Sequence, residues 1–256
     1  MPNVKEIFDF LNTVAPFGMQ DTWDNSGLLV NCENEVHKIL TCIDATMDIV
    51  KKAEALGCDL IVTHHPNIFN GVKQLDTSFP GGYAFSKGIS VISCHTNLDC
   101  CEHNLSDIMA ERLGLKGYSA VTYNREFDGK PVGYGRYADC EPMTPDELAA
   151  ICKEAYGCVS IRYVKGTAPI TKIAFCSGAG SDFWMDAQKE GAQAYVTADV
   201  KHHEFLDAKN SGFTVIDCGH YETETWAADL LSDLICEKFS DVEVVVSRLD
   251  DYFHTI

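Results

Sequence analysis

The chain has 256 residues, of which 46% are hydrophobic and 23% are charged, and this composition excludes a disordered or fibrous protein. Lysine and arginine total 20 against 38 aspartate and glutamate residues, which gives a formal net charge of -18. A surface this acidic repels phosphate backbones and anionic lipids, so we expect no nucleic-acid partner and no membrane association.

The chain starts with MPNVKEIFDFLN, which has charges among its apolar positions and lacks the uninterrupted apolar core of a signal peptide. No later apolar run is long enough to span a bilayer. We therefore expect a cytoplasmic protein.

The segment from 37 to 65 has the pattern of strand, helix and strand. KILTCID, at 38–44, is rich in β-formers, and Thr46 is a suitable helix N-cap. Apolar residues then recur on one helical face, and Gly57 is placed to end the helix. That face contains Ile49, Val50, Ala53 and Leu56. CDLIVT, at 58–63, is a continuous apolar run typical of a buried parallel strand.

The same unit occurs twice in the chain. Residues 37–65 align without gaps on 171–199 with nine identities, and GISVISCH aligns on GFTVIDCGH further along. In the second copy Ser181 is the candidate helix cap and Gly191 the candidate stop. We predict two similar α/β domains with strands joined by helical crossovers.

Between the copies, the sequence predicts a strand at 133–140, a helix and a strand at 159–164. The helix has a strong start, with Thr144 as cap, Pro145 in the first turn and Glu147 three residues after the cap. The polar stretch near 121–130 indicates a boundary, which gives a first domain at 1–125 and a second at 126–256. A helix with Trp226 on its buried stripe and a strand at 242–246 close the chain. The partner of that strand stays open, and this C-terminal segment could pack back on the first domain.

Twelve cysteines are present, without any C-x-x-C pair. Several lie inside strand-like apolar runs, where cysteine behaves as a small buried hydrophobic residue. Because a disulfide framework suits small secreted chains, we expect reduced thiols here. The adjacent Cys100 and Cys101 are the one pair whose role stays open.

Three predicted strand ends carry residues of the types that bind metals. His64 and His65 follow DLIVT, His95 and Asp99 follow VISC, and His220 and Glu224 follow VIDCG. The last two clusters occupy equivalent positions of the repeat and have the spacing His-x-x-x-carboxylate, which places both side chains on one side of a first helical turn. Each motif alone is weak, but their combination predicts a metal site at the carboxyl ends of the strands.

Four imidazoles and two carboxylates are too many donors for one tetrahedral ion. They suit two divalent transition-metal ions per chain, with Asp99 and Glu224 as bridging ligands, in a cleft between the two domains. Mixed nitrogen and oxygen donors without thiolate fit Zn, Fe, Mn or Co.

Other motifs are weaker. His202 and His203 are either pocket residues or solvent-facing, and Asp24-Asn25-Ser26-Gly27 has the composition of a turn. Gly178-Ala179-Gly180 resembles a phosphate-binding loop but lacks the lysine that such loops carry.

Taken together, WDNSGLLV, IVTHHPNIF, CHTNLD, VTADVKHH and DCGHYETE closely resemble the Nif-three-like dinuclear metal centre family, whose members are labelled GTP cyclohydrolase 1 type 2 homologues. The resemblance implies a two-metal site with the same six ligands and a ring-shaped homohexamer. It departs from the family pattern at Ala198, where a glycine is usual.

Our leading functional hypothesis is a GTP cyclohydrolase-like, metal-dependent hydrolase that opens the purine ring of a nucleotide, with the substrate supplied by the family label alone. Two alternatives stay open. One is a two-metal phosphoesterase for a small phosphorylated molecule, and the other is a non-catalytic metal-binding ring or scaffold. No general acid or base is evident apart from the ligands.

Overall fold

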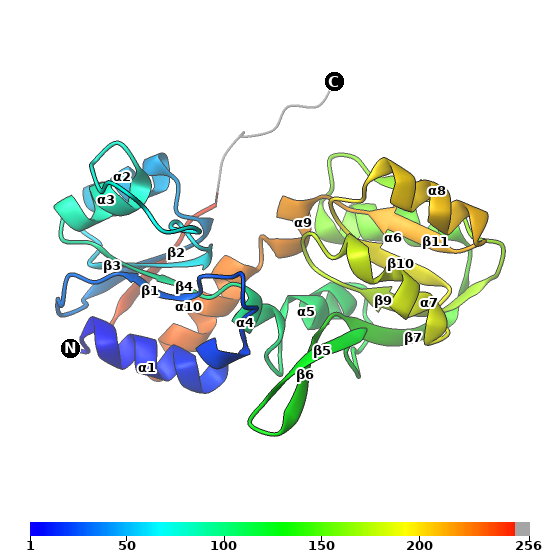
Figure 1. Cartoon of the computed structure of the whole chain (residues 1–256), viewed down its shortest axis with the longest axis horizontal. Coiled ribbons are helices and arrows are strands. Elements are labelled where there is room, and N and C mark those ends of the chain that lie inside the picture. Colours follow the sequence, from blue (N-terminus) through cyan, green and yellow to red (C-terminus); the bar gives the residue numbers. More distant parts are fainter. Residues whose placement is uncertain (249–256) are drawn as a thin grey trace. The chain divides into compact units, whose positions relative to one another are not determined.

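The computed structural model describes residues 1–248, which form two compact units (Figure 1). Unit 1 contains Met1–Glu102 and the described residues from Thr225 onward, and unit 2 contains His103–Glu224. The first break therefore falls at Glu102 and not at 125, because the helix that begins at Leu105 packs on strands of unit 2. The end of the predicted second domain, 249–256, lies outside the described residues.

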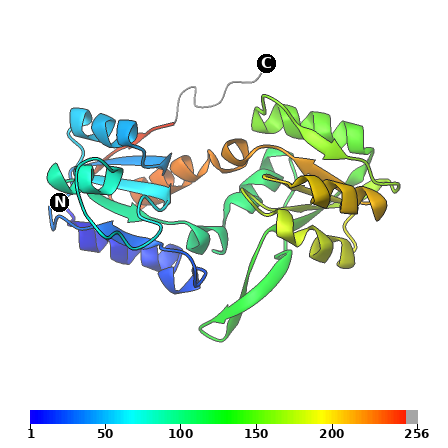
Figure 2. The ribbon, with the colours of Figure 1, turned by 45° about the horizontal axis from the view of Figure 1, so that its top comes forward.

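Unit 1 is built on a five-stranded sheet with the order β1-β4-β3-β2-β12. All neighbouring strands are parallel except β1, which runs antiparallel to β4. Helices α2 and α3 cover one face of this sheet, and α1 and α10 cover the other (Figures 1 and 2). The elements are α1 (Val4–Val14), the 3-10 helix η1 (Phe17–Met19), β1 (Gly27–Val30), β2 (Lys38–Asp44), α2 (Met47–Leu56), β3 (Leu60–His65), α3 (Pro80–Ser86), β4 (Ser90–Ser93), α4 (Thr96–Asp99), α10 (Ala227–Lys238) and β12 (Glu243–Val246).

Local sequence explains how α2 begins and ends. The Thr46 side chain accepts a hydrogen bond from the backbone N–H of Ile49, and Gly57 adopts the left-handed conformation with φ of 69°. Ile49, Val50 and Ala53 are buried as predicted. The prediction for Leu56 is wrong, because this residue at the last turn is 38% exposed.

Unit 2 has a second five-stranded sheet with the order β7-β9-β10-β11-β8. Helices α7 and α8 lie on one face and α6 on the other (Figure 1). The elements are α5 (Leu105–Arg112), β5 (Thr122–Phe127), β6 (Lys130–Tyr134), β7 (Arg136–Met143), α6 (Pro145–Tyr156), β8 (Arg162–Val164), β9 (Ile170–Phe175), the 3-10 helix η2 (Ser181–Phe183), α7 (Trp184–Lys189), β10 (Ala194–Thr197), α8 (His202–Asn210), β11 (Thr214–Asp217) and α9 (His220–Glu224). The predicted capping box of α6 at Thr144 and Glu147 is present.

The sheets confirm the internal repeat. The order β4-β3-β2 in unit 1 corresponds to β11-β10-β9 in unit 2, with parallel pairing in both. Each core also carries one antiparallel strand at the same edge, β1 on β4 and β8 on β11. At the opposite edge the units differ: β12 pairs parallel with β2, whereas β7 pairs antiparallel with β9. The fold is therefore α/β, built from two similar sheets.

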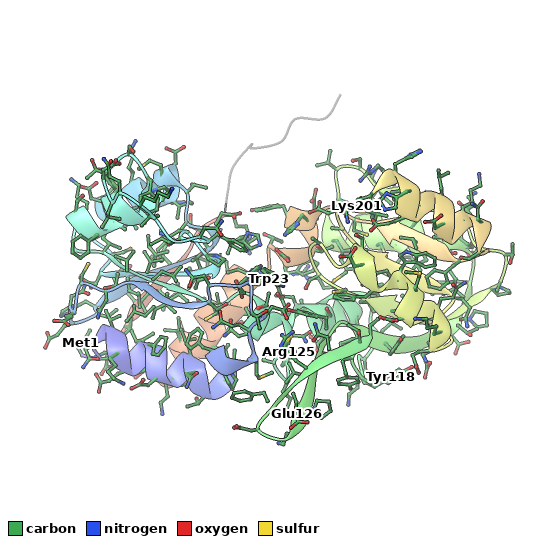
Figure 3. The ribbon with its side chains drawn as sticks, viewed as in Figure 1. Met1, Trp23, Tyr118, Arg125, Glu126 and Lys201 are labelled. Carbon is green, nitrogen blue, oxygen red and sulfur yellow. The ribbon has the colours of Figure 1, made fainter. Side chains whose placement is uncertain are left out.

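Two local predictions are wrong. The polar stretch near 121–130 forms the β5–β6 hairpin, a separate two-stranded sheet whose Arg125 and Glu126 are labelled in Figure 3. Its turn residues Asp128 and Gly129 both have positive φ, which is the conformation that an Asp-Gly hairpin turn requires. Ser181 does not cap α7, because it begins a 3-10 turn that precedes the helix.

Both cores are apolar and tightly covered. Residues Leu60 to His64 of β3 and all residues of β10 are buried, as expected for strands with helices on both faces. All twelve cysteines lie in the described residues, and no disulfide joins any of them. Within residues 1–248, no helix combines the length and apolar character that a membrane span requires.

Candidate metal centre

Two histidines end β3. His64 is fully buried, and its Nδ1 atom lies 2.8 Å from the carbonyl oxygen of Cys94. His65 is partly exposed, and its Nδ1 atom lies 2.7 Å from Asp44 Oδ1 at the end of the neighbouring strand β2. Because Nδ1 of each ring faces an oxygen acceptor, Nε2 is the atom directed away from that acceptor.

His95 follows the end of β4 and precedes the short helix α4. Its Nδ1 atom lies 2.8 Å from Asp24 Oδ1. Ligand atoms of His64, His65 and His95 all lie within 4.8 Å of one another. Asp99, in the last position of α4, has its Oδ1 atom 3.8 Å from His64 Nε2. Unit 1 therefore brings all four of its predicted site residues together; we call them the unit 1 cluster.

Asp24 contacts the candidate site, and the sequence interpretation missed this because its neighbours have the composition of an ordinary turn. Its buried carboxylate accepts hydrogen bonds from the His95 ring, from the backbone N–H and hydroxyl of Thr96, and from the Ser26 hydroxyl. Burial alone would raise the pKa of Asp24, but these hydrogen bonds outweigh burial and hold the pKa well below its usual range. Asp24 is therefore a fixed anion that orients the His95 ring.

His220 and Glu224 form the unit 2 cluster at the ends of α9. His220 Nε2 lies 2.9 Å from Glu224 Oε2, and His220 Nδ1 lies 2.7 Å from Asp199 Oδ2. Burial lowers the pKa of His220, but the hydrogen bonds with Asp199 and Glu224 raise it to about 11. Asp199 faces Nδ1 of His220 and Glu224 faces Nε2, so a metal ion at Nε2 would have the Glu224 carboxylate beside it.

Gly178, which follows β9, packs directly against the unit 2 cluster. It has a φ of 57°, and a side chain at this position would overlap the Glu224 carboxylate. Its backbone N–H also donates to the Thr223 hydroxyl, 3.0 Å away. The resemblance of Gly178-Ala179-Gly180 to a phosphate loop is thus explained by close packing against the buried Glu224 side chain.

The weaker histidine candidates lie elsewhere. His202 and His203 begin α8 and are both exposed to solvent. Cys100 and Cys101 are buried. Neither pair belongs to the groups of ligand-forming residues found within residues 1–248.

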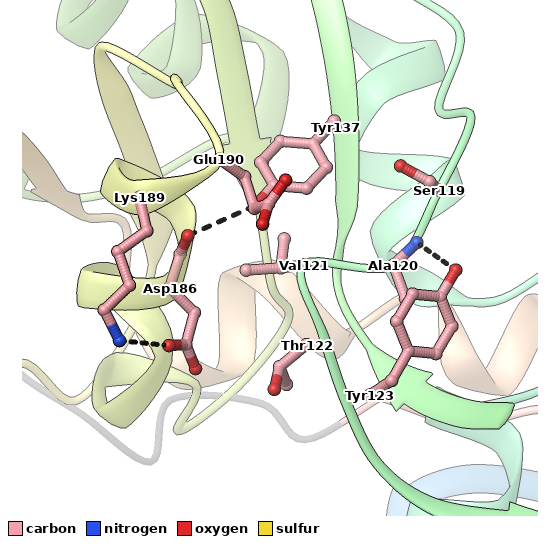
Figure 4. Close-up of a pocket in the computed structure, with 9 residues that line it drawn as sticks. All are labelled: Ser119, Ala120, Val121, Thr122, Tyr123, Tyr137, Asp186, Lys189 and Glu190. Carbon is pink, nitrogen blue, oxygen red and sulfur yellow. Dashed lines mark hydrogen bonds and ion pairs between the residues drawn. The ribbon is translucent and has the colours of Figure 1, made fainter.

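A separate surface pocket of about 420 Å³ lies in unit 2 between the segment 119–123, β7 and α7 (Figure 4). Its charged lining comes from α7 and the residue after it, where Asp186 forms a 3.0 Å ion pair with Lys189 beside Glu190. It contains no histidine or cysteine, so it lacks the donors that distinguish the two clusters.

Comparison with known proteins identifies the family. A family model described as Duf34/NIF3 (NGG1p interacting factor 3) matches residues 2–252. The chain belongs to the Duf34/NIF3 family.

Relatives of this NIF3 protein carry enzyme names. A Clostridium perfringens protein named GTP cyclohydrolase 1 type 2 homolog is 31% identical over 253 residues, which cover 96% of each chain. A Helicobacter pylori protein named GTP cyclohydrolase 1 type 2 is 32% identical over 244 residues, which cover 92% of each chain. The resemblance noted from the motifs is confirmed.

The fold is also that of solved NIF3-like structures. The Staphylococcus aureus hypothetical protein SA1388 matches with a TM-score of 0.87 and 28% identity, over 99% of each chain. The repeated α/β architecture of this NIF3 chain is therefore shown independently of its sequence motifs.

The donors of both clusters in this NIF3 chain fit divalent transition metals. They are imidazole nitrogens and carboxylate oxygens, and each of the four imidazoles has Nδ1 hydrogen-bonded to a carbonyl or carboxylate oxygen. This second layer of acceptors fixes the ring and raises the basicity of the opposite nitrogen, as at known metal sites. The carboxylate acceptors are Asp24, Asp44 and Asp199. Asp24 and Asp199 lie inside the motifs WDNSGLLV and VTADVKHH, but only the three-dimensional arrangement shows which histidine each one contacts.

Proposed function

We propose that this NIF3 chain is a metal-dependent hydrolase that binds two divalent transition-metal ions through His64, His65, His95, Asp99, His220 and Glu224. One observation supports this above the others: all four histidines are held by an oxygen acceptor at Nδ1, at distances of 2.7 to 2.8 Å. An oxygen acceptor at Nδ1 is the usual arrangement of metal-binding histidines, and four of them at strand ends favour metal binding over a purely structural role.

The proposed substrate is a purine nucleotide, and the reaction is hydrolytic opening of its imidazole ring. The names of the Clostridium and Helicobacter relatives support this substrate class. Bound divalent ions would polarise the substrate and activate water near neutral pH, since coordination lowers the pKa of water to about 7. In this proposal the chain orients its histidines through Asp24, Asp44 and Asp199, and the carboxylates of Asp99 and Glu224 balance the charge of the ions. A homohexamer, as the family resemblance implies, is part of the same proposal.

Metal content tests the ligand set. Protein purified without a histidine tag or chelator should contain about two equivalents of Zn, Fe, Mn or Co per chain by elemental analysis. His64→Ala, Asp99→Ala and Glu224→Ala should each lose metal, whereas His203→Ala, a matched variant of an exposed histidine on α8, should retain it. Metal-free wild-type protein, or unchanged metal in the three variants, would contradict the assignment.

Products separate the candidate activities. Metal-loaded protein incubated with GTP should lose the purine absorbance as one water opens the imidazole ring and leaves its carbon as a formamide. A second water would release that carbon as formate, so both the formamide product and formate are measured. Release of inorganic phosphate with the purine intact would identify a phosphoesterase instead. Full metal occupancy without turnover of any nucleotide would favour the metal-binding scaffold.

A further inference from the structure

Two exposed aromatic side chains lie beside the unit 1 cluster. Trp23, on the loop before β1, is 57% exposed, and Phe69, on the loop after β3, is 45% exposed (Trp23 is labelled in Figure 3). Their ring centroids are 5.9 Å apart and their planes differ by 28°, so the two rings stack. Large aromatic side chains left in water at a functional site indicate a surface that something covers.

Both rings also contact a proposed metal ligand. The Trp23 ring lies 5.9 Å from the His95 ring at an angle of 74°, and the Phe69 ring lies 6.3 Å from it at 68°. The imidazole plane is therefore steeply inclined to both rings. A flat group stacked on the outer face of either aromatic ring would lie near His95. We call Trp23 and Phe69 the aromatic pair.

The residues after Trp23 hold the pair in place. Asp24 binds the His95 ring, and the Asn25 side-chain amide donates to the carbonyl oxygen of Ile68, 2.6 Å away and directly before Phe69. The tripeptide Trp23-Asp24-Asn25 thus fixes one aromatic ring, one candidate metal ligand and the loop that carries the second ring. A platform held on two sides needs little ordering when it binds a ligand.

We propose that the aromatic pair binds the base of a free purine nucleotide by stacking, beside His95. This rests on the proposed function, which supplies the nucleotide, while the stacked geometry supplies the requirement for a flat ring. Stacking on aromatic side chains tolerates any base because every base has a π-face. A nucleic-acid strand is disfavoured as the occupant, because its long run of phosphates would meet a chain with a net charge of -18. A free nucleotide brings only a few phosphates, and the two proposed metal ions would offset their charge.

Fluorescence can report the binding directly. The chain has three tryptophans, and Trp184 and Trp226 are only 6% and 5% exposed, so a base that stacks on the surface should quench Trp23 selectively. Metal-loaded wild-type protein, excited at its red edge, should be quenched by GTP but not by inorganic triphosphate, which lacks the base. Equal quenching by triphosphate would overturn the stacking assignment.

Variants give the affinity. Trp23→Leu and Phe69→Leu should weaken GTP binding, measured by calorimetry, by roughly 10-fold or more with unchanged metal content. Trp23→Phe should keep most of the affinity. Phe85→Leu alters a phenylalanine on α3 that is 54% exposed, and it should keep all of the affinity. Unchanged GTP affinity in the two leucine variants would refute the aromatic pair as a binding platform. A shift in their sedimentation without a change in affinity would refute it too, since the pair would then be a contact between copies of the chain.

The same variants separate this proposal from the proposed function. Tight, Trp23-dependent binding of GTP without hydrolysis would support the platform and reject the hydrolase. Hydrolysis of GTP with an unchanged KM in Trp23→Leu would support the hydrolase and reject the platform.

Discussion

The strand ends of the two units start from the same repeat but carry their functional groups at different positions. In unit 1, Asp44 at the end of β2 holds His65 at the end of β3. In unit 2, Asp199 after β10 holds His220 after β11. In both of these pairs the carboxylate lies at the end of the strand that precedes the histidine's strand in the chain. The pair in unit 2 lies one strand further along the sheet than the pair in unit 1, because β10 is the equivalent of β3.

The repeat alignment shows which side chains differ between the two units. His65 of unit 1 corresponds to Asp199 of unit 2, so a candidate ligand in one copy is an orienting residue in the other. Asp44 corresponds to Gly178, which has no side chain, and in unit 2 the Glu224 carboxylate packs against the backbone there. Equivalent positions at the strand ends of the two units therefore have different roles, and the side chains around each position determine which role it has.

Among these variants Gly178→Ala should have the largest effect, because it adds a side chain where the backbone packs against Glu224. The new Cβ would overlap the Glu224 carboxylate, so we expect loss of at least half of the bound metal by elemental analysis. Gly191→Ala is the control for backbone strain, because Gly191 has a left-handed φ of 84° but no neighbouring atom within 4 Å of an added Cβ. That control should lose about 1 kcal/mol of stability but no metal. Metal retained in Gly178→Ala would show that Glu224 is not needed in its present place.

The orienting carboxylates should have intermediate effects that follow their burial. Asp24→Asn removes a fully buried anion and should weaken metal binding about 10- to 100-fold. Asp199→Asn should cost less, because the Asp199 side chain is 57% exposed and water can replace part of its interaction. Competition with a chromogenic chelator measures both, with the exposed Asp233→Asn on α10 as control. A larger loss of metal affinity in Asp199→Asn than in Asp24→Asn would mean that burial of the carboxylate does not determine its contribution.

The smallest effects should come from the outer edges, where the sheets differ. Arg136 on β7 donates to the largely buried Asp107 of α5 over 3.0 Å, whereas β12 is joined to β2 by Lys38 and a mostly exposed Glu243, 2.9 Å apart. Asp107→Ala should lower the free energy of unfolding by about 1 to 3 kcal/mol, and Glu243→Ala by no more than about 0.5 kcal/mol. Urea unfolding of the two variants checks this; equal losses would remove the distinction between the edges.

The features predictable from the sequence are those fixed by neighbouring residues. Thr46 and Thr144 as helix caps, the buried strand β3 and the repeated unit all depend on patterns within a few residues or on self-similarity. The six candidate ligands were selected because their types recur at strand ends. Asp128-Gly129 is a typical hairpin-turn dipeptide, but the polar residues around it also fit the domain boundary predicted near 121–130.

The orienting residues could not be predicted in the same way. Asp24 and His95 are 71 positions apart, and only the antiparallel pairing of β1 with β4 brings their loops together. Asp44 has no spacing that distinguishes it from a surface carboxylate. Asp199 is distinguished as the repeat equivalent of His65, but that position does not show that it contacts His220. Their roles depend on which strands become neighbours, and strand order is a property of the whole chain.

The path of the chain through the two sheets also bears on its synthesis. β2 receives its outer neighbour β12 from residues 243–246, which the ribosome makes only after all of unit 2. Until then β2 is an open edge with unpaired backbone groups, the kind of surface that recruits other strands. The first unit to be translated is therefore the last to be completed, and a nascent chain that stalls in unit 2 exposes a sheet edge that the finished protein never shows.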